Sequence, residues 1–316
     1  MKTLRIEEAA QWLQQQDNLV LLTHRRPDGD TVGSAAALCR GLRKLGKTAS
    51  VLENPQLTPR YVSYLEGLTV AAVPQGAKVV SVDVAGTEML PQNWEGTAID
   101  LLIDHHGTNR GFAELGHNDP SSAACGEIIY EILMALGVVL DKDISNALYV
   151  AVCTDTGCFR YSNTTGHTLR TAAACLEGGA DFYRINKEIY GTVSLGRLRL
   201  NAYMTDHMRL YADGKIALVF IPLELEQELG LGEDDLEDVS GFGRSVAGVH
   251  LAVTFRTVKD GSTKISVRCA PEYDGAALCV HFGGGGHRAA AGATIREPQE
   301  KAGEMVLEAL KMQGLI

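Results

Sequence analysis

An aspartate and two histidines stand in a row, Asp104-His105-His106, directly after the apolar run at residues 98–103. Carboxylates and imidazoles bind divalent metals and transfer protons, and a strand that ends just before them would hold them rigidly. Aspartate and histidine are also common in turns at strand ends, so the triplet alone supports a metal site and an ordinary turn about equally. The other polar motifs have to decide between these two interpretations.

A second set of such residues follows the apolar run at residues 18–22, which predicts a buried strand. His24, Asp28 and Asp30 come next, and a helix is expected from about residue 35 to 45. Ligands bind at the carboxyl ends of strands in open α/β sheets, where these side chains would lie. Oxygen ligands suit Mn(II) or Mg(II), and His24 favours a transition metal. A turn with a helix cap would explain the aspartates but not His24.

Two further acidic residues follow predicted elements. Asp83 ends the predicted strand at residues 78–82, where helix capping is the ordinary alternative. Asp155 follows the helix predicted at residues 143–151, and a glycine, an aromatic residue and Arg160 come soon after it. That grouping could supply a metal ligand and then a contact to a base or phosphate. A helix-ending glycine with a solvated arginine is the alternative.

Taken together, these motifs hold the carboxylates and imidazoles that two metal ions need. Most of them follow separate strands, which a parallel sheet would bring side by side. Two metals in one site form a clamp that suits in-line displacement at phosphorus. The predicted ligand set is His24, Asp28, Asp30, Asp83, His105 and Asp155.

The order of elements predicts two domains. Strands alternate with helices in the first part, which indicates an α/β domain with a mostly parallel sheet and helices on both faces, at residues 1–190. A connector is expected at residues 191–200. After it, hairpin signals at residues 213–214 and 260–261 indicate a smaller α+β domain at residues 201–316. Its acidic stretch at residues 224–238 is expected to be a solvated helix and loop.

A run of glycines near the end of the second domain follows an apolar helix and continues into His287. Glycines let a backbone approach a ligand closely and direct its amide groups at a phosphate. A flexible linker is the alternative, but linkers are longer and rich in serine. We therefore predict a phosphate-binding loop formed by Gly283, Gly284, Gly285 and Gly286.

Composition limits the partners and the location of the chain. Its 316 residues carry a net charge of -10, which argues against a grip on long duplex nucleic acid, so an anionic substrate should be small. Seven scattered cysteines without a CxxC pair argue against a disulfide framework and a structural zinc site. The N-terminus does not resemble a secretory signal, and no apolar run is long enough to cross a membrane. A cytoplasmic protein without a membrane partner is expected.

These motifs as a set resemble the DHH phosphoesterase family. Within it, the chain is similar to the NrnA-type group of oligoribonucleases and 3'-phosphoadenosine 5'-phosphate phosphatases. The resemblance implies a hydrolase of phosphoester bonds, of the 3'-nucleotidase or exoribonuclease type, that acts on very short oligoribonucleotides and 3'-phosphorylated nucleotides. A phosphodiesterase of linear or cyclic dinucleotides such as cyclic di-AMP, and a nucleotide-binding regulator without turnover, are the alternatives. The motifs that carry the resemblance are residues 24–34, Asp83, Asp104 to His106, Asp155, Arg268 and residues 283–287.

The resemblance also implies roles for the metal-site residues. His24, Asp28 and Asp83 would hold one Mn(II), and Asp30, Asp83, His105 and Asp155 the other, so that Asp83 bridges the two ions. Mg(II) and Co(II) are alternative ions. Attack on phosphorus would be in line, with both metals engaged.

Other residues would act on the substrate. His106 would face the substrate phosphate and stabilise charge or protonate the leaving oxygen, while Asp104 orients an imidazole. The glycine run, His287 and Arg268 would bind a phosphate across an interdomain cleft, with Arg160 a weaker candidate. A homodimer is compatible with the sequence.

Overall fold

The computed structural model describes residues 1–96, 98–232, 234–236 and 239–316. The chain divides into two compact units, Met1–Thr192 and Val193–Ile316. Residues 191–200, expected to be a connector, include the first turns of helix α8 (Leu195–Asp206).

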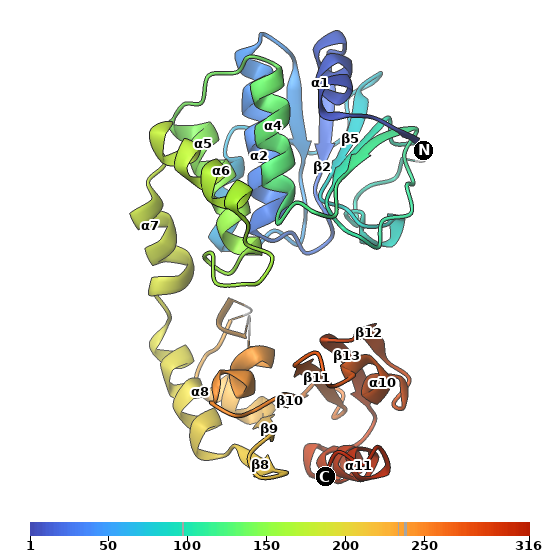
Figure 1. The fold of residues 1–316 in the computed structure, drawn as a ribbon, viewed down its shortest axis with the longest axis vertical. Helices are drawn as coiled ribbons and strands as arrows, with labels where there is room; N and C mark the ends of the chain where they lie inside the picture. Colours follow the sequence, from blue (N-terminus) through green and yellow to red (C-terminus); the bar gives the residue numbers. More distant parts are fainter. Residues whose placement is uncertain (97, 233, 237–238) are drawn as a thin grey trace. The chain divides into compact units, whose positions relative to one another are not determined.

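The first unit is built on a sheet that has seven strands in the described part of the chain (Figure 1). The strands pair in parallel in the order β1-β7-β6-β5-β2-β3-β4, which confirms the predicted α/β class with a parallel sheet. Strands β2, β5 and β6 are therefore neighbours, and their carboxyl ends meet at one edge. The strands are β1 (Lys2–Thr3), β2 (Leu19–Leu22), β3 (Ala49–Leu52), β4 (Thr69–Val70), β5 (Lys78–Val82), β6 (Leu101–Asp104) and β7 (Leu115–Asn118).

Helices cover one face of this sheet, and Figure 1 shows α2, α4, α5 and α6 side by side. Alternate strand residues such as Leu21 and Ile103 join the helices in one apolar core, because successive side chains of a strand point to opposite faces. The helices are α1 (Ile6–Gln15), α2 (Gly29–Lys44), α3 (Val62–Leu65), α4 (Cys125–Ala135), α5 (Lys142–Asp155), α6 (Gly166–Glu177) and α7 (Phe182–Asn186), which runs into a π-helical turn, Lys187–Gly191.

Helices were expected on both faces of the sheet, but loops cover the opposite face in the described residues. Leu22 and Leu102 point to that side, and the described side chains that pack there come from loops, among them Leu90, Trp94 and Phe112. The described part of the link from β5 to β6 contains one turn of 3-10 helix, Thr87–Met89. Glycine and proline in this link, which break helices, account for the difference.

Helices α2 and α5 are both longer than predicted, and each carries a candidate ligand. Asp28 caps α2 by accepting hydrogen bonds from the backbone N–H groups of Asp30 (3.0 Å) and Thr31 (3.2 Å), so the helix begins at Gly29 and not near residue 35. Helix α5 runs four residues past its predicted end and finishes at Asp155. Asp30 and Asp155 are thus fixed by helices and not by strand ends.

The second unit contains a sheet with the strand order β12-β13-β11-β10-β9-β8 in the described residues. Its pairs are antiparallel except β9 with β10, and both predicted hairpins, β8–β9 and β10–β11, are present. Helices α10 and α11 pack in its core, which confirms the smaller α+β domain. The elements are β8 (Arg209–Tyr211), β9 (Ile216–Ile221), α9 (Leu223–Glu228), β10 (Leu251–Thr257), β11 (Thr263–Cys269), α10 (Gly275–Val280), β12 (Gly285–His287), β13 (Ala290–Ile295) and α11 (Gln299–Met312). In the predicted acidic stretch, α9 and a turn at Asp234–Leu236 are present, and residues 233, 237 and 238 lie outside the described residues.

The glycine run is more ordered than the predicted loop. Gly285 and Gly286 belong to β12, which pairs with β13. A Cβ atom on Gly284 would lie 2.2 Å from the carbonyl oxygen of Gly292, and one on Gly286 would lie 2.6 Å from the Cα atom of Ala291. Close packing of the strand therefore requires two of the glycines.

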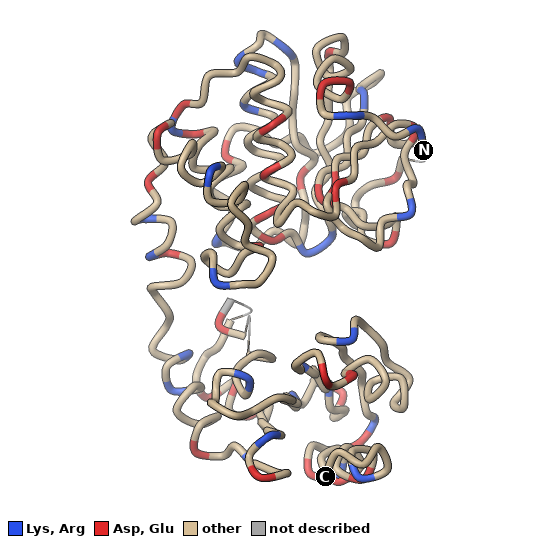
Figure 2. Tube along the Cα trace, viewed as in Figure 1, with Lys and Arg blue, Asp and Glu red and all other residues tan. Residues whose placement is uncertain are grey.

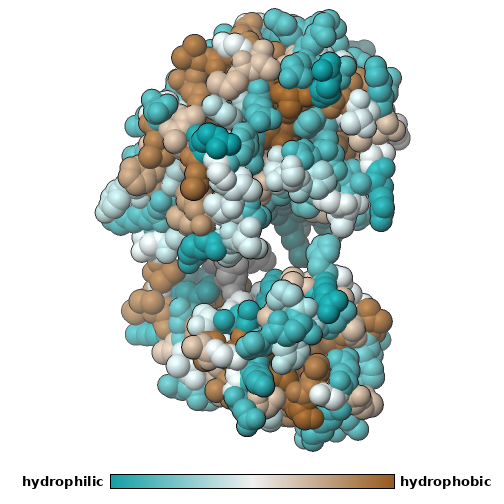
Figure 3. Space-filling model, viewed as in Figure 1, coloured by the Kyte–Doolittle hydropathy of each residue, from teal (hydrophilic) through white to brown (hydrophobic). Residues whose placement is uncertain are grey.

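Charged residues of both signs are interspersed along each unit (Figure 2). Hydrophobic side chains are exposed over the helices of the first unit (Figure 3), among them Leu169, Leu176 and Phe182. They offer an area through which two copies could associate, and the homodimer stays a prediction. In the described part of the chain, no helix combines the length and the apolar character that a membrane span needs.

Candidate metal centre

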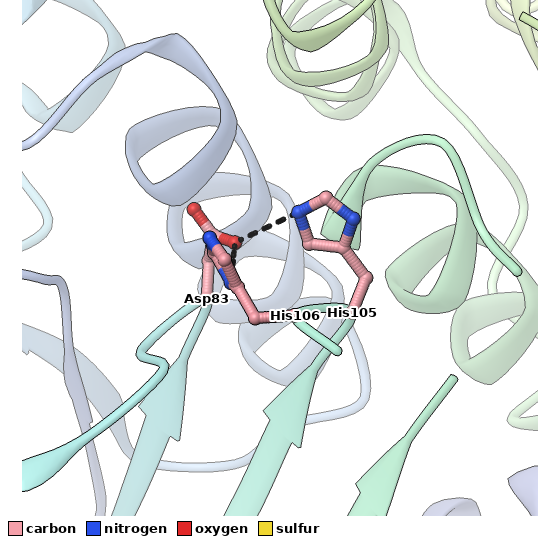
Figure 4. A group of neighbouring side chains, drawn as sticks. All are labelled: Asp83, His105 and His106. Carbon is pink, nitrogen blue, oxygen red and sulfur yellow. Dashed lines mark ion pairs between the residues drawn. The ribbon is translucent and has the colours of Figure 1, made fainter. Parts of the chain in front are cut away.

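Three neighbouring strands deliver the central side chains. His24 follows β2, Asp83 follows β5 directly, and Asp104 is the last residue of β6. Because these strands are adjacent and parallel, residues far apart in sequence converge at one edge. Figure 4 shows the Asp83 carboxylate facing His105 and His106, with dashed lines that join it to both imidazoles.

Asp83 occupies the centre of the site. Its φ of 59° is in the left-handed region, which is uncommon for a residue other than glycine, and its backbone N–H donates to the carbonyl oxygen of Ile103 at 2.9 Å. Its side chain is 3% exposed. Oδ1 lies 3.4 Å from His105 Nε2 and 3.6 Å from His106 Nδ1, yet it has no hydrogen-bond partner among the described residues. A buried carboxylate oxygen without a hydrogen-bond partner fits the role of a metal ligand.

The first candidate group consists of His24, Asp28 and Asp83, whose donor atoms lie within 4.8 Å of one another. His24 Nε2 is 3.4 Å from Asp28 Oδ1 and 3.7 Å from Asp83 Oδ2. His24 Nδ1 lies 3.0 Å from the carbonyl oxygen of Arg25, which can only accept, so Nδ1 carries the proton. The lone pair of the neutral ring is then on Nε2, the nitrogen that faces the carboxylates.

The second candidate group consists of Asp30, His105 and Asp155. His105 Nε2 lies 3.7 Å from Asp30 Oδ2 and 3.5 Å from Asp155 Oδ2. His105 Nδ1 is 3.1 Å from the carbonyl oxygen of Ser122, which again leaves the Nε2 lone pair toward the carboxylates. These two groups contain all the residues predicted as ligands, and a third group, Asp83, His105 and His106, overlaps both of them.

Asp30 has a second role that the sequence did not indicate. Its Oδ2 accepts a hydrogen bond from the backbone N–H of Cys125 (2.7 Å), and its Oδ1 accepts from Gly126 N–H (2.9 Å) and Ser34 Oγ (3.0 Å). These amides begin α4, so Asp30 caps that helix from α2. Burial, followed by the charges of Asp83 and other nearby aspartates, nevertheless raises the pKa of Asp30 well above its usual value.

The electrostatics of the site favour bound cations. Burial and the charge of Asp83 raise the pKa of Asp155 to about 6, against the lowering effect of His105. Burial alone would lower the pKa of His105, but Asp83 and the other carboxylates raise it to about 10, and Asp28 and Asp83 similarly raise the pKa of His24 to about 9. His24 and His105 thus retain protons to a higher pH than usual, and a divalent metal would replace these protons. Carboxylate and imidazole donors fit Mn(II) and similar ions.

Comparison with known proteins agrees with this geometry. The model of the DHH family, N-terminal domain, matches residues 18–152. The bifunctional oligoribonuclease and PAP phosphatase NrnA of Thermus thermophilus is 32% identical over 302 residues, which are 93% of this chain and 89% of that protein. The chain belongs to the DHH family. It is therefore a hydrolase of the DHH phosphoesterase type.

Other relatives share the fold or the family. The NrnA protein of Bacillus subtilis, also named a bifunctional oligoribonuclease and PAP phosphatase, is 27% identical across 88% of this chain and 90% of its own length. The crystal structure of an exopolyphosphatase-related protein from Bacteroides fragilis superposes with a TM-score of 0.85 at 23% identity. That match covers 97% of this chain and 95% of the other, and it shows that both units have the same fold as that protein.

Within the DHH motif, His106 differs from His105. Its Nδ1 lies 2.8 Å from Asp104 Oδ1, and the Asp104 side chain is completely buried. The pKa of Asp104 lies below its usual value because bonds from His106 and Asn109 outweigh burial. The carboxylate accepts only, so His106 Nδ1 is the donor and is not free to bind a metal. Asp104 therefore orients His106, whose ring is 34% exposed.

Arg160, the weaker candidate for substrate binding, is held in place by local contacts. Its Nε donates to the carbonyl oxygen of Gly157 at 2.6 Å, and its guanidinium lies 5.3 Å from the ring centre of Tyr190. The preceding aromatic residue, Phe159, is partly buried against the first core, and the predicted contact to a base or phosphate stays a prediction. The role of Arg160 in substrate binding is therefore supported by its closeness to Asp155 in the sequence.

Two substrate-binding candidates of the second unit, Arg268 and His287, lie on strands that flank β13 on either side. His287 of β12 pairs with Ala290 of β13, which in turn pairs with Arg268 of β11. Residues paired across strands point to the same face, so Arg268 and His287 share a face about 10 Å apart. The glycines of β12 run along the same edge.

Several residues that support the ligands were missed by the sequence analysis. Thr31 Oγ1 accepts from the His24 N–H (3.2 Å) and donates to the Val82 carbonyl (2.9 Å), which links the ends of β2 and β5. Asn54 Nδ2 donates to the His24 carbonyl at 2.9 Å. These residues bond backbone atoms of other segments, so the sequence does not show the contacts. The available signal was that they are short polar residues near strand ends.

Proposed function

We propose that this chain hydrolyses very short oligoribonucleotides and 3'-phosphoadenosine 5'-phosphate and that it uses Mn(II). The observation that carries the proposal is that Asp83 belongs to one group of donors and lies 3.4 Å from His105 of the other, while its buried Oδ1 has no hydrogen-bond partner in the described residues. The substrate class is supported by the names of the two NrnA relatives, each of which is matched over most of its length.

The proposed ligands divide between two ions. One would be held by His24, Asp28 and Asp83, and the other by Asp30, Asp83, His105 and Asp155, with Asp83 shared. When bound, the ions supply positive charge that polarises the phosphoryl group and makes water a stronger nucleophile for in-line attack. Mg(II) or Co(II) could take the place of Mn(II) because the donor set suits them as well.

His106 is the proposed proton donor. Asp104 accepts a hydrogen bond from His106 Nδ1–H, so Nε2 is the ring nitrogen that would face a substrate oxygen. The bond to Asp104 raises the pKa of His106 and keeps the imidazolium populated at higher pH. His106 can then stabilise charge on the phosphate or protonate the leaving ribose oxygen.

The second unit would bind a phosphate of the nucleotide. Arg268 supplies positive charge and His287 a ring nitrogen from one face of its sheet. Gly283, Gly284, Gly285 and Gly286 would let the backbone approach the phosphate closely at the same edge, where the N–H groups of Gly283 and Gly284 already donate to the carbonyls of Val280 and Cys279. The net charge of -10 fits short substrates, because a long polyanion would be repelled.

The deciding experiment is an assay of the purified protein with Mn(II) against RNAs of two to about twenty nucleotides, 3'-phosphoadenosine 5'-phosphate and cyclic di-AMP. The ionic strength is held constant, because contacts to phosphates weaken as the salt concentration rises and would distort the dependence on RNA length. We expect turnover of the shortest RNAs and of the 3'-phosphorylated nucleotide. Exclusive cleavage of dinucleotides would favour the alternative phosphodiesterase. No turnover of any substrate would favour a nucleotide-binding regulator.

A further inference from the structure

Asn109, in the turn after the DHH motif, uses its whole side-chain amide in hydrogen bonds. Nδ2 donates to Asp104 Oδ2 at 2.6 Å and to the carbonyl oxygen of Val84 at 3.0 Å, and Oδ1 accepts from the Gly111 N–H at 2.7 Å. An amide has two donor hydrogens and one acceptor oxygen, so these bonds fix its orientation. Asn109 is half-buried, and its own backbone N–H donates to the His106 carbonyl at 3.1 Å.

The two oxygens of Asp104 have different partners as a result. Oδ1 faces His106 Nδ1 at 2.8 Å, and Oδ2 faces the Asn109 amide. The Asp104 side chain has no contact with solvent, so its Oδ2 depends on the Asn109 amide for a hydrogen-bond donor. If the amide is removed, the carboxylate would have a buried oxygen without a donor and could rotate away from His106.

The bond to Val84 connects this turn to the next strand end. Val84 is the residue after Asp83, so a single amide ties the segment after β5 to the turn after β6. Asp83 has a left-handed backbone, which persists only where surrounding contacts hold it. Asn109 therefore contacts both parts of the site, the proton donor through Asp104 and the shared carboxylate through its neighbouring peptide.

We propose that Asn109 is a positioning residue for phosphoester hydrolysis. It holds the Asp104 carboxylate so that Asp104 fixes the ring of His106. This inference rests on the proposed function of His106 as the group that faces the substrate. It adds a residue that makes no contact with the reacting atoms and acts through another side chain.

The test compares three variants in the full chain. Asn109→Asp has the same shape and keeps the acceptor for Gly111, but it loses both donor hydrogens; Asn109→Ala loses the whole amide. Asn93→Ala is the matched control. Asn93 Nδ2 also donates to a loop carbonyl, that of Glu53 at 2.6 Å, but this bond does not involve Asp104.

We expect kcat to fall about 10- to 100-fold in both Asn109 variants while KM changes less than about twofold, and no change in Asn93→Ala. The second readout is the proton resonance of His106 Nδ1–H in metal-free protein. It should be observed in the wild type and in Asn93→Ala, and be lost or shifted in Asn109→Asp. Circular dichroism checks that each variant is folded.

The outcomes separate this inference from the proposed function. An unchanged kcat and an unchanged Nδ1–H resonance in Asn109→Asp would overturn the positioning role. If the wild type hydrolyses none of the substrates, the proposed function fails, but a shifted resonance would still support the role of Asn109 in holding His106. A shifted resonance with normal kcat would show that the orientation of His106 does not limit the reaction, and the proposal would be rejected.

Discussion

Asp30 Oδ2 accepts a 2.7 Å hydrogen bond from the backbone N–H of Cys125, so a proposed metal ligand on α2 also begins helix α4. The same carboxylate is 3.7 Å from His105 Nε2. One side chain therefore belongs both to the proposed metal centre and to the packing of the helices. Asp155 differs, because it is the last residue of α5 and does not cap another helix in the described part of the chain.

The two aspartates should respond differently to substitution. Asp30→Ala leaves the first amides of α4 unpaired in the interior and should destabilise the metal-free protein by about 1 to 3 kcal/mol. Asp155→Ala relieves repulsion among the carboxylates and should leave metal-free stability unchanged or higher. Both should weaken Mn(II) binding. Urea unfolding with and without chelator measures this, and equal destabilisation by both variants would contradict the capping role.

Asp83 should be indispensable for hydrolysis but not for folding. Asn at this position retains the shape and tolerates the left-handed backbone, so Asp83→Asn should remain folded. With the shared charge removed, we expect activity with Mn(II) to fall at least about 100-fold. Steady-state assays at saturating metal provide the measurement. Near-normal rates in this variant would refute the bridging role.

The metal-free protein should lose stability as pH rises. The folded-state pKa values of His24 and His105 are raised to about 9 and about 10, so their stabilising contribution is complete below the unfolded value near 6.5 and disappears as pH passes through 9 to 10. Asp155, whose folded-state pKa is raised from 3.8 to about 6, acts in the same direction at lower pH, because the folded protein holds its proton between those two values and the unfolded chain does not. Bound Mn(II) should remove or reverse this trend. Unfolding curves at pH 6 to 10 in chelator and in Mn(II) test it, and a stability that rises with pH in chelator would disprove it.

Close packing of α2 on α5 should matter for the metal site. A Cβ atom on Gly33 would lie 2.3 Å from the backbone carbonyl oxygen of Ala147, so Gly33→Ala forces the helices apart. We expect a loss of about 1 to 3 kcal/mol in stability and weaker Mn(II) binding. Gly41→Ala in the same helix is the control, because its Cβ would meet only the movable end of the Leu133 side chain. A smaller effect at position 33 than at position 41 would show that the helix contact is adaptable.

Substrate binding by the second unit predicts a change in KM. Arg268→Ala and His287→Ala should each raise KM for 3'-phosphoadenosine 5'-phosphate about 10-fold or more, the value of a charged hydrogen bond, with little change in kcat. Lys301→Ala is a suitable control, since Lys301 pairs with Glu304 on the exposed side of α11. A loss confined to kcat would instead place Arg268 and His287 outside substrate binding.

The convergence of the proposed ligands could be predicted from the sequence, because the apolar runs before several of them identify the strands. The apolar runs before His24, Asp83 and Asp104 mark buried parallel strands, and the rule that such strands end together places these residues at one edge. The helical positions of Asp30 and Asp155 were not predicted, because the cap at Asp28 and the packing of α5 extend both helices beyond their periodic cores.

Other features depend on contacts that no local pattern encodes. Asn109 is recognised as a supporting residue only when the Val84 carbonyl, 25 positions earlier, is known to lie beside it. The strand at Gly285–His287 results from pairing with β13, whereas a glycine run by itself predicts an open loop. The loop-covered face of the first sheet likewise reflects packing by side chains such as Trp94.

The left-handed backbone of Asp83 implies a trade-off between stability and activity at that position. Glycine adopts this conformation without steric cost, whereas a β-carbon there costs about 1 kcal/mol. A library selected only for folding should therefore enrich glycine and asparagine at position 83, and selection for turnover should return aspartate. Comparing the two selections would show how much conformational stability the protein gives up to keep a carboxylate in the middle of its metal centre.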